Sequence, residues 1–578
     1  MKVYSYHTFV LPFIWEQADK CHQKDIDSFA YCFKSNPNWK SVNMEETYKL
    51  KTEETFSEND DVFSHYNEYQ YFYPFVRDVL YGYKASVVRN FSFMPADVHN
   101  KAEYHIYKTY NKAKENGKAI KAVKHYLLHI NGIKLKIYNT GVALFILECE
   151  NHGKDGDGKP QNTLNDVKNI NDYGRRITLP FIPCGPDYSS VCADKLSVVI
   201  PEKKISFEDD FLAFAKSLNA ENSNAKTISG KISMNHICDY IKEILSYGSD
   251  EFYFTSKKPE HETDVNYKQD PVINGKTPVY IHPALDDRMF VASIVIDAVE
   301  TDKMREEKDG DFAFLNDAEL SRSLYQLAFI DPGKLNYDDS ITGNCTCRSD
   351  KMRKKLLDEH VYDRWTEYKS EGYCGTLYTV ANQGLIALGN YYDDAKIINP
   401  FLTEYVQMCC LCLMQKSTLI HLQDKASEVS DNIEKPGKNI SRKTITRLMN
   451  LQERFVAYQS QLSFTEVTAQ EQGIEIYDLL RKFMFIEKET ETLADRLEKL
   501  EAASETNLDF KFNKIALIFT LVAFFLSVCG DFLLCFIKED GTWLFGNSSL
   551  FTWLFAIIIT CVTVSFLVIM YLYRRRKK

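Results

Sequence analysis

Two long apolar runs near the carboxyl end constrain this chain of 578 residues more than any other feature. The first extends from about Phe512 to Ile537 and the second from about Leu550 to Tyr573. Each exceeds the roughly 20 residues that a helix needs to cross a hydrocarbon layer about 30 Å thick. Buried helices of a soluble domain are the alternative, which the closeness of the two runs and the basic residues at 574–578 disfavour. The sequence therefore predicts two transmembrane helices joined by an external loop, 538–549.

Basic residues around the runs set the expected orientation. Lys511, Lys514 and the five basic residues of the cytoplasmic tail, 574–578, lie on one side, whereas the loop 538–549 has one Lys against two acidic residues. By the positive-inside bias both termini face the cytoplasm of a multi-pass protein in the inner (plasma) membrane. The rest of the chain is strongly acidic. Residues 1–573 carry a net charge of −15, and the five basic residues of the tail bring the total to −10. That balance argues against direct binding of nucleic acid.

Residues 1–395 predict a cytosolic α/β (or α+β) sensor domain. Asn131-Gly132 between alternating apolar residues is a signal for a type I′ hairpin. Val142–Leu147 is apolar at every position, which predicts a central strand covered on both faces. Fifteen irregularly spaced Cys favour a reducing cytosol. Further strands are expected at Phe9–Trp15, Leu196–Ile200, Met289–Ile296 and Gly375–Leu388. Polar connections are expected at 151–171, 257–276 and 300–311, and the acidic run 300–311 is interpreted as a solvated loop.

Residues 396–511 predict a helical hairpin followed by a long helical stalk. Helices are expected over Asn399–Val429 and about Ser441–Thr468. A third starts near Gln470, and no Gly or Pro interrupts it from Ile474 until Gly530. Roughly 60 residues at 1.5 Å each make a rod about 90 Å long. The sequence thus predicts one continuous helix that enters the first apolar run.

The third helix carries an apolar seam. Its members recur at alternating spacings of three and four, and most residues between them are charged, as in a coiled coil. The seam favours a subunit or helix-pair contact, and an amphipathic helix packed on its own domain is the alternative. It comprises Ile476, Leu479, Phe483, Ile486, Leu493, Leu497 and Leu500, with Thr490 at the remaining position.

The first apolar run also has a polar face. Six residues share one side of the helix, and polar groups facing lipid are costly, so this face is expected to line a pore in an oligomer. Leu517 and Phe524 would gate by dewetting, and Asp531 would favour cations at the outer mouth. Packing against the second run is the alternative. The face comprises Asn513, Leu517, Thr520, Phe524, Ser527 and Asp531.

The order of these elements resembles the CorA-type superfamily of divalent-cation channels. The hallmark of that superfamily, Gly-Met-Asn at the outer end of the first span, is replaced here by Cys529-Gly530-Asp531-Phe532, which puts ordinary magnesium uptake in doubt. Further segments are similar to a narrower branch, the CorA-like membrane proteins encoded with type III CRISPR systems. These are Tyr4–Phe9, Tyr69–Tyr81, Ile130–Leu147, Gly375–Tyr378 and Phe464–Leu480.

The resemblance implies an antiviral effector rather than an enzyme. Its cytosolic domain would sense a nucleotide second messenger, in that branch an S-adenosylmethionine–AMP conjugate, and its membrane part would open or disrupt the bilayer. It also implies a homo-oligomer in contact with lipid, typically a pentamer. The alternatives are a transporter for a divalent metal cation as permeant ion, and a membrane-anchored enzyme.

Sequence motifs locate no ligand, cofactor or metal site. Cys345 and Cys347, with Cys374 and His360, lack the second paired half of a zinc site. Basic residues beside aromatic ones, such as Arg77 and Arg364, could stack on a nucleotide, but such pairs are more often structural.

Overall fold

The computed structural model of this chain describes fourteen stretches of it and divides it into two compact units. The first unit comprises Met1–Asp431 and Thr446–Leu497, and the second comprises Asn432–Ile445 and Glu498–Lys578. The stretches described are 3–17, 26–42, 67–82, 87–97, 101–115, 118–154 with 156, 158–178, 192–213, 237–256, 275–335, 345–369, 375–433 and 442–534.

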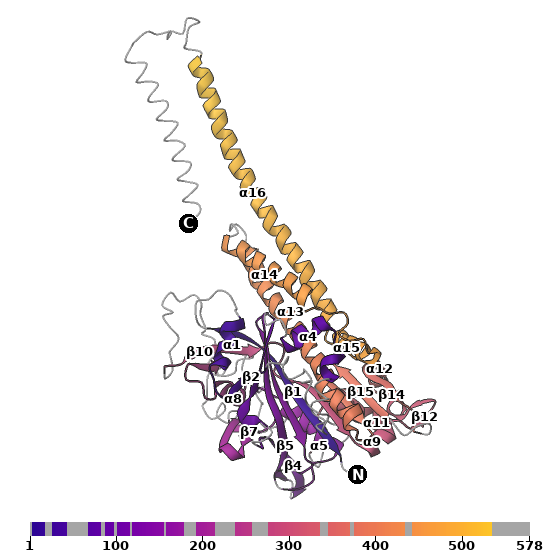
Figure 1. The fold of residues 1–578 in the computed structure, drawn as a ribbon. Coiled ribbons are helices and arrows are strands. Elements are labelled where there is room, and N and C mark those ends of the chain that lie inside the picture. The colour runs from indigo at the N-terminus through magenta and orange to yellow at the C-terminus, as the bar shows by residue number, and fades with distance from the viewer. Residues whose placement is uncertain are drawn as a thin grey trace, which may run out of the picture. The chain divides into compact units, whose positions relative to one another are not determined.

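A mixed sheet organises the first unit (Figure 1). Its 14 described strands are β1 (Tyr4–Gln17), β2 (Trp39–Ser41), β3 (Val88–Phe93), β4 (Glu103–Glu115), β5 (Lys118–Tyr138), β6 (Val142–Asn151), β7 (Lys195–Ile200), β8 (Ile205–Asp210), β9 (Phe252–Thr255), β10 (Thr277–Pro283), β11 (Phe290–Ile296), β14 (Val361–Thr366), β15 (Gly375–Ala381) and β16 (Gly384–Gly389). A separate pair consists of β12 (Glu307–Lys308) and β13 (Asp311–Phe312).

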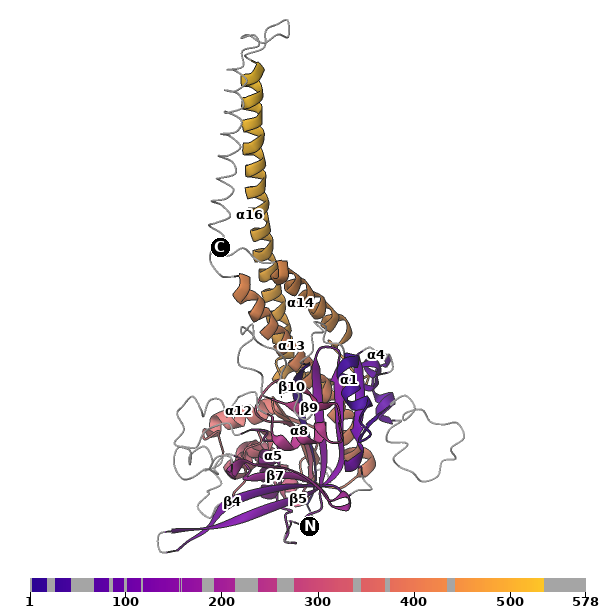
Figure 2. The same cartoon turned by 90° about the vertical axis from the view of Figure 1, so that its left-hand side faces the viewer.

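The strand order places the amino-terminal strand in the middle of the sheet. The main path is β14-β15-β16-β11-β1-β6-β5-β4-β7-β8, with β10 and β9 branching from β1 and with β3 and β2 branching from β5. The pairs β11–β16 and β9–β10 are parallel, and the other pairs in this sheet are antiparallel. Figure 2 shows β4 and β5 extending beyond the rest of the sheet.

The structure describes twelve α-helices. They are α1 (Ile26–Lys34), α4 (Pro74–Tyr81), α5 (Leu164–Gly174), α8 (Asp239–Ser246), α9 (Ala298–Met304), α10 (Ala313–Asn316), α11 (Ala318–Ala328), α12 (Asp350–His360), α13 (Val406–Ile433), α14 (Arg442–Gln461), α15 (Glu471–Phe483) and α16 (Ile486–Leu534). Short 3₁₀ turns lie at Met94–Ala96 and Pro201–Lys203, and π-helical turns at Asp394–Ile398 and Phe401–Tyr405.

Both faces of the sheet are buried. Along Val142–Leu147 of β6, residues of one parity belong to the main core and those of the other parity are equally inaccessible, which confirms the predicted central strand. The second face lies under α13. There Lys136 of β5 donates to Gln407 Oε1 at 2.7 Å, and the hydroxyls of Thr140 and Thr418 are 3.0 Å apart. The predicted buried strand at Phe9–Trp15 is likewise confirmed as the centre of β1.

The predicted hairpin at Asn131-Gly132 is wrong. Both residues lie inside the continuous strand β5, which pairs with β4 up to His129 and with β6 from His129 onward. A bulge between Ile130 and Gly132 marks this exchange of neighbours. Gly132 suits the bulge because a Cβ there would approach Glu148 Oε2 to 3.0 Å. The Asn-Gly pair therefore serves a strand that changes partners, a use that local patterning does not distinguish from a turn.

Two of the predicted polar connections contain secondary structure, so the interpretation of 300–311 as a solvated loop is wrong. Residues 151–171 include most of α5, and 300–311 include the end of α9 together with β12. Charged residues dominate the exposed sides of these short helices, so the composition of the segments does not reveal that the other sides are apolar. In α5, for example, Leu164, Val167 and Ile170 are buried.

The predicted fold class, an α/β domain with a long stalk and two carboxyl-terminal transmembrane helices, is also wrong. The fold is a mixed α/β arrangement around the large sheet. Among the described residues, one helical segment, Lys396–Asp431, is long and apolar enough to cross a membrane, and 67% of its most apolar window is buried. Its apolar character follows from burial against the second face of the sheet. The run Phe512–Ile537 forms the end of α16 as far as Leu534, and Leu550–Tyr573 lies outside the described residues.

The continuous rod from Gln470 is interrupted. The chain ends α15 at Phe483 and starts α16 at Ile486. Between them, Phe485 has a left-handed φ of 57° although it is not glycine. Absence of Gly and Pro did not reveal this break, because tertiary contacts impose it. Lys416 of α13, for example, donates to the carbonyl of Met484 at 2.7 Å.

Candidate functional site

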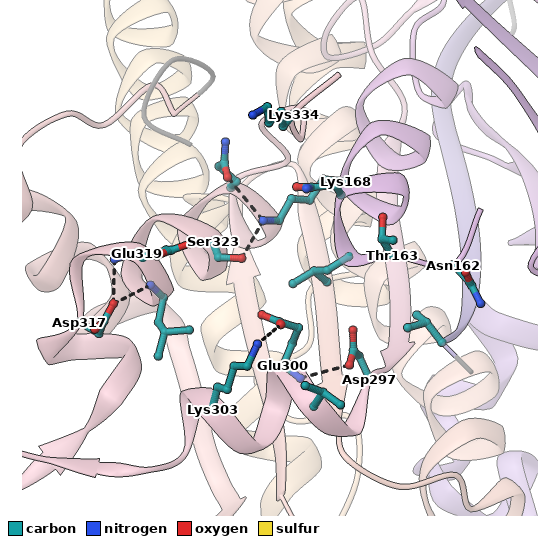
Figure 3. A pocket seen from close by; sticks show the side chains of 16 residues that line it. Asn162, Thr163, Lys168, Asp297, Glu300, Lys303, Asp317, Glu319, Ser323 and Lys334 are labelled. Atoms are coloured by element: carbon teal, nitrogen blue, oxygen red, sulfur yellow. Dashed lines mark hydrogen bonds and ion pairs between the residues drawn. The ribbon is translucent and has the colours of Figure 1, made fainter. Parts of the chain in front are cut away.

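A polar cavity of about 720 Å³ opens in the first unit beside α5, α9 and α11 (Figure 3). Charged and amide side chains dominate its wall, and three of the lining residues are lysines. The wall comprises Val3, Asn162, Thr163, Leu164, Asn165, Lys168, Asp297, Val299, Glu300, Lys303, Asp317, Glu319, Leu320, Ser323, Gln326 and Lys334.

The three helices begin at this cavity, each with its own capping side chain. Thr163 and Asp166 form a capping box at α5, in which Thr163 Oγ1 accepts from the amide of Asp166 at 3.1 Å. Asp297 caps α9, and Asp317 caps α11. These caps satisfy amides of the first turns, so the helix ends do not supply the free positive charge of the cavity.

Lys168 of α5 is the most buried cation of the wall. Its side chain is 3% exposed and donates to Ser323 Oγ at 2.8 Å and to Gln326 Oε1 at 3.4 Å, both on α11. In the part of the chain that the structure describes, no carboxylate lies within 4.0 Å of its ammonium. Burial lowers the pKa of Lys168 to about 8. An ammonium whose hydrogen-bond partners are neutral is costly to bury, and Glu300 and Cys345 offset that cost only in part, since the pKa stays lowered.

Acidic side chains of α9 line another part of the cavity. Figure 3 shows Asp297 and Glu300 together, with Lys168 reaching toward Ser323 on the other side. Glu300 pairs with Lys303 at 2.7 Å, and Asp297 Oδ1 accepts from the amide of Glu300 at 3.1 Å. Burial raises the pKa of the Asp297 carboxyl. The cavity thus offers a buried cation and separate carboxylate acceptors, which suits a ligand with both an anionic group and hydrogen-bond donors.

The predicted pore residues fall on α16 of the second unit. Leu517, Thr520 and Ser527 are exposed, and Thr520 Oγ1 donates to the carbonyl of Ala516 at 2.7 Å. The backbones of Asn513, Phe524, Asp531 and the segment Cys529–Phe532 are helical, but their side chains lie outside the described ones. The pore assignment stays a prediction.

The predicted seam is inaccessible within the single chain. Apart from the partly exposed Leu479, its apolar members are buried. Polar contacts join the same region to α13, where Gln423 donates to Glu489 Oε2 at 2.7 Å and Lys416 lies 3.5 Å from Glu489. The start of α16 is thus held by α13.

The basic and aromatic pairs are engaged within the chain. Arg364 pairs with Glu471 at 2.7 Å and also with Glu475, and Arg77 lies 4.5 Å from the centre of the Tyr69 ring. The contacts of Arg364 tie β14 to α15, whereas Arg77 of α4 stacks on a ring close to it in sequence. Cys345 is buried and Cys374 lies outside the described residues.

Sequence reasoning missed every residue of the cavity. Two signals could have indicated it: the sequence Thr163-x-x-Asp166 before an apolar period, and Lys168 among the buried positions of that period. Neither signal shows that α5 and α11 meet, since about 150 residues separate them in sequence.

Comparisons with known proteins give no family assignment. A search of family models finds none that matches this chain, and a search of curated proteins finds no relative.

Proposed function

We propose that this protein is a membrane-acting effector that a nucleotide second messenger switches, as its resemblance to proteins of type III CRISPR antiviral defence implies. One observation carries the proposal. Four large apolar side chains stand exposed within little more than one turn of α16: Leu517 (61%), Ile518 (42%), Phe519 (70%) and Leu521 (50%). A soluble protein rarely exposes such a patch unless it meets a membrane or another protein.

The same helix supports a mechanism for switching. α16 starts inside the first unit, where Glu489 bonds to Gln423 and lies beside Lys416, and it carries the apolar patch in the second unit. A ligand that prefers one packing of the first unit would change the environment of Ile486–Leu497. The ligand must bind the active packing more tightly, because equal affinity for both packings shifts nothing.

Vesicle leakage tests this proposal. Purified full-length protein is added to dye-loaded vesicles of phosphatidylethanolamine and phosphatidylglycerol, with AMP, ATP or an S-adenosylmethionine–AMP conjugate. We expect leakage that depends on one nucleotide. Leakage that ignores all of them and follows a divalent-cation gradient would favour the transporter alternative, and nucleotide turnover would favour the anchored enzyme.

A charge in the patch should abolish the effect. Leu517→Lys places a charge in the apolar patch, and a charge that contacts lipid is costly, so leakage should fall at least about tenfold. Val456→Lys is the matched control, because Val456 is an exposed aliphatic residue (58%) on a helix of the first unit. Equal leakage from the two variants would count against a membrane role for α16.

A further inference from the structure

One of three deeply buried lysines lines the cavity. Lys108, Lys136 and Lys168 are each at most 4% exposed. Lys108 donates to the carbonyl of Cys192 and lies 4.8 Å from the centre of the Tyr173 ring. Lys136 donates to the carbonyl of Leu80 at 3.1 Å and to Gln407. Of these three, Lys168 alone lines a described cavity of ligand size.

The geometry points to a ligand for this cation. We propose that the cavity beside α5, α9 and α11 binds the switching ligand, which presents a phosphate or carboxylate to Lys168 and hydrogen-bond donors to Asp297 and Glu300. An ammonium carries three donors, and Ser323 and Gln326 accept two of them. The third donor is available to an anion in the cavity, and a charge-assisted bond of this kind is about twice as strong as a neutral one.

The remaining wall supports the same class of ligand. Lys334 adds a second cation, and the Glu300–Lys303 pair leaves carboxylate lone pairs for donors such as ribose hydroxyls or an amine. The volume of about 720 Å³ lies within the range of small-molecule sites, roughly 300–1,000 Å³. Twelve of the 16 lining residues are polar or charged, which suits a soluble ligand better than an acyl chain. The inference rests on the proposed function in one respect: it assigns the switching ligand to this site.

Binding to the full chain in detergent tests the site. Isothermal titration calorimetry with inorganic phosphate, adenosine and AMP as probes should show AMP binding more tightly than adenosine. Lys168→Met keeps the length of the side chain and removes its charge, so the affinity for AMP should fall about 10- to 100-fold. Lys136→Met is the matched control, a second buried lysine with neutral acceptors, and should bind AMP as the wild type does.

A second variant tests the acidic part. Asp297→Asn keeps a good helix cap and removes the carboxylate. We therefore expect the affinity for AMP to fall several-fold and the affinity for inorganic phosphate to stay unchanged. The inference is overturned if the wild type binds neither phosphate nor AMP, or if Lys168→Met binds AMP with unchanged affinity.

Vesicle leakage separates this inference from the proposed function. Suppose that the wild type binds AMP, that Lys168→Met weakens this binding, and that the wild type releases no dye with any nucleotide. That result would overturn the proposed function and leave the site standing. Nucleotide-dependent leakage that persists unchanged in Lys168→Met would leave the function standing and overturn the site.

Discussion

The charge of Lys168 lowers the stability of the folded protein. Its pKa in the folded chain, about 8, lies below the value near 10.4 of an unfolded chain, so folding disfavours its charged form. This penalty is fully present below pH 8 and disappears as the pH rises past about 10.4. A residue that costs stability and lines a cavity is typical of a site retained for binding.

Replacing the charge should therefore stabilise the protein. We expect Lys168→Met to unfold at a higher denaturant concentration than the wild type at pH 7, with a gain of up to about 3 kcal/mol in the free energy of unfolding. Chemical denaturation of both proteins measures the difference, which should shrink between pH 8 and pH 10. A destabilised variant at pH 7 would show that Ser323 and Gln326 compensate the charge fully.

The affinity of the cavity for an anion should decrease as the pH rises, because Lys168 then loses its charge. Glu300 and Cys345 favour the charged form of Lys168, and the cations Lys303 and Lys334 line the same cavity. Because phosphate binds the ammonium, AMP affinity should fall as the pH rises through about 8. Titrations between pH 7 and 9.5 check this, since the AMP phosphate keeps its charge throughout. Lys168→Met should show a flat profile, and a flat wild-type profile would contradict the assignment.

At the scale of elements, the break between α15 and α16 is the least ordinary backbone feature of the helical region. Phe485 holds a left-handed φ of 57°, which costs roughly 1–2 kcal/mol for a residue with a side chain, and its ring is 53% exposed. Contacts around it hold the geometry. Lys416 lies 5.6 Å from the centre of the ring, and His360 stacks on Phe483 at 3.6 Å between ring centres. The break therefore sets where α16 begins.

Phe485→Gly should relieve this strain. Glycine adopts positive φ readily, and little buried contact is lost, so we expect about 0.5–1 kcal/mol of added stability. Thermal unfolding of the variant measures it. Phe483→Gly is the contrasting change, because Phe483 is buried in a helix, and it should destabilise by several kcal/mol. Destabilisation by Phe485→Gly would indicate that its ring supplies more than it costs.

For the whole molecule, ligand binding and the start of α16 should be coupled. Hydrogen exchange of the full chain with and without AMP tests this. We expect altered protection at Met484–Leu497 as well as at α5 and α11, because α13 lies under the sheet and bonds to Glu489. Changes confined to α5, α9 and α11 would describe a binding site without transmission.

The sequence predicted individual strands better than their arrangement. Runs that are apolar at every position, such as Phe9–Trp15 and Val142–Leu147, report burial on both faces directly. The route of the sheet depends on contacts between distant residues, so Asn131-Gly132 could not be read as a bulge. Apolar length was ambiguous in the same way, because Lys396–Asp431 is apolar through burial within the fold. The cavity escaped notice because its residues, including Lys168, Asp297 and Ser323, come together only through tertiary packing.

The central place of β1 constrains how this chain reaches its fold during synthesis. Residues 4–17 pair with β6 once about 150 residues exist, but their other neighbours, β10 and β11, are made only after residue 277, and β16 joins β11 after residue 384. The open edge of β1 therefore waits on the ribosome until residue 296 has been made, and the open edge of β11 waits until residue 384 and beyond. Such late closure favours slow folding and calls for protection by chaperones until the carboxyl half has emerged.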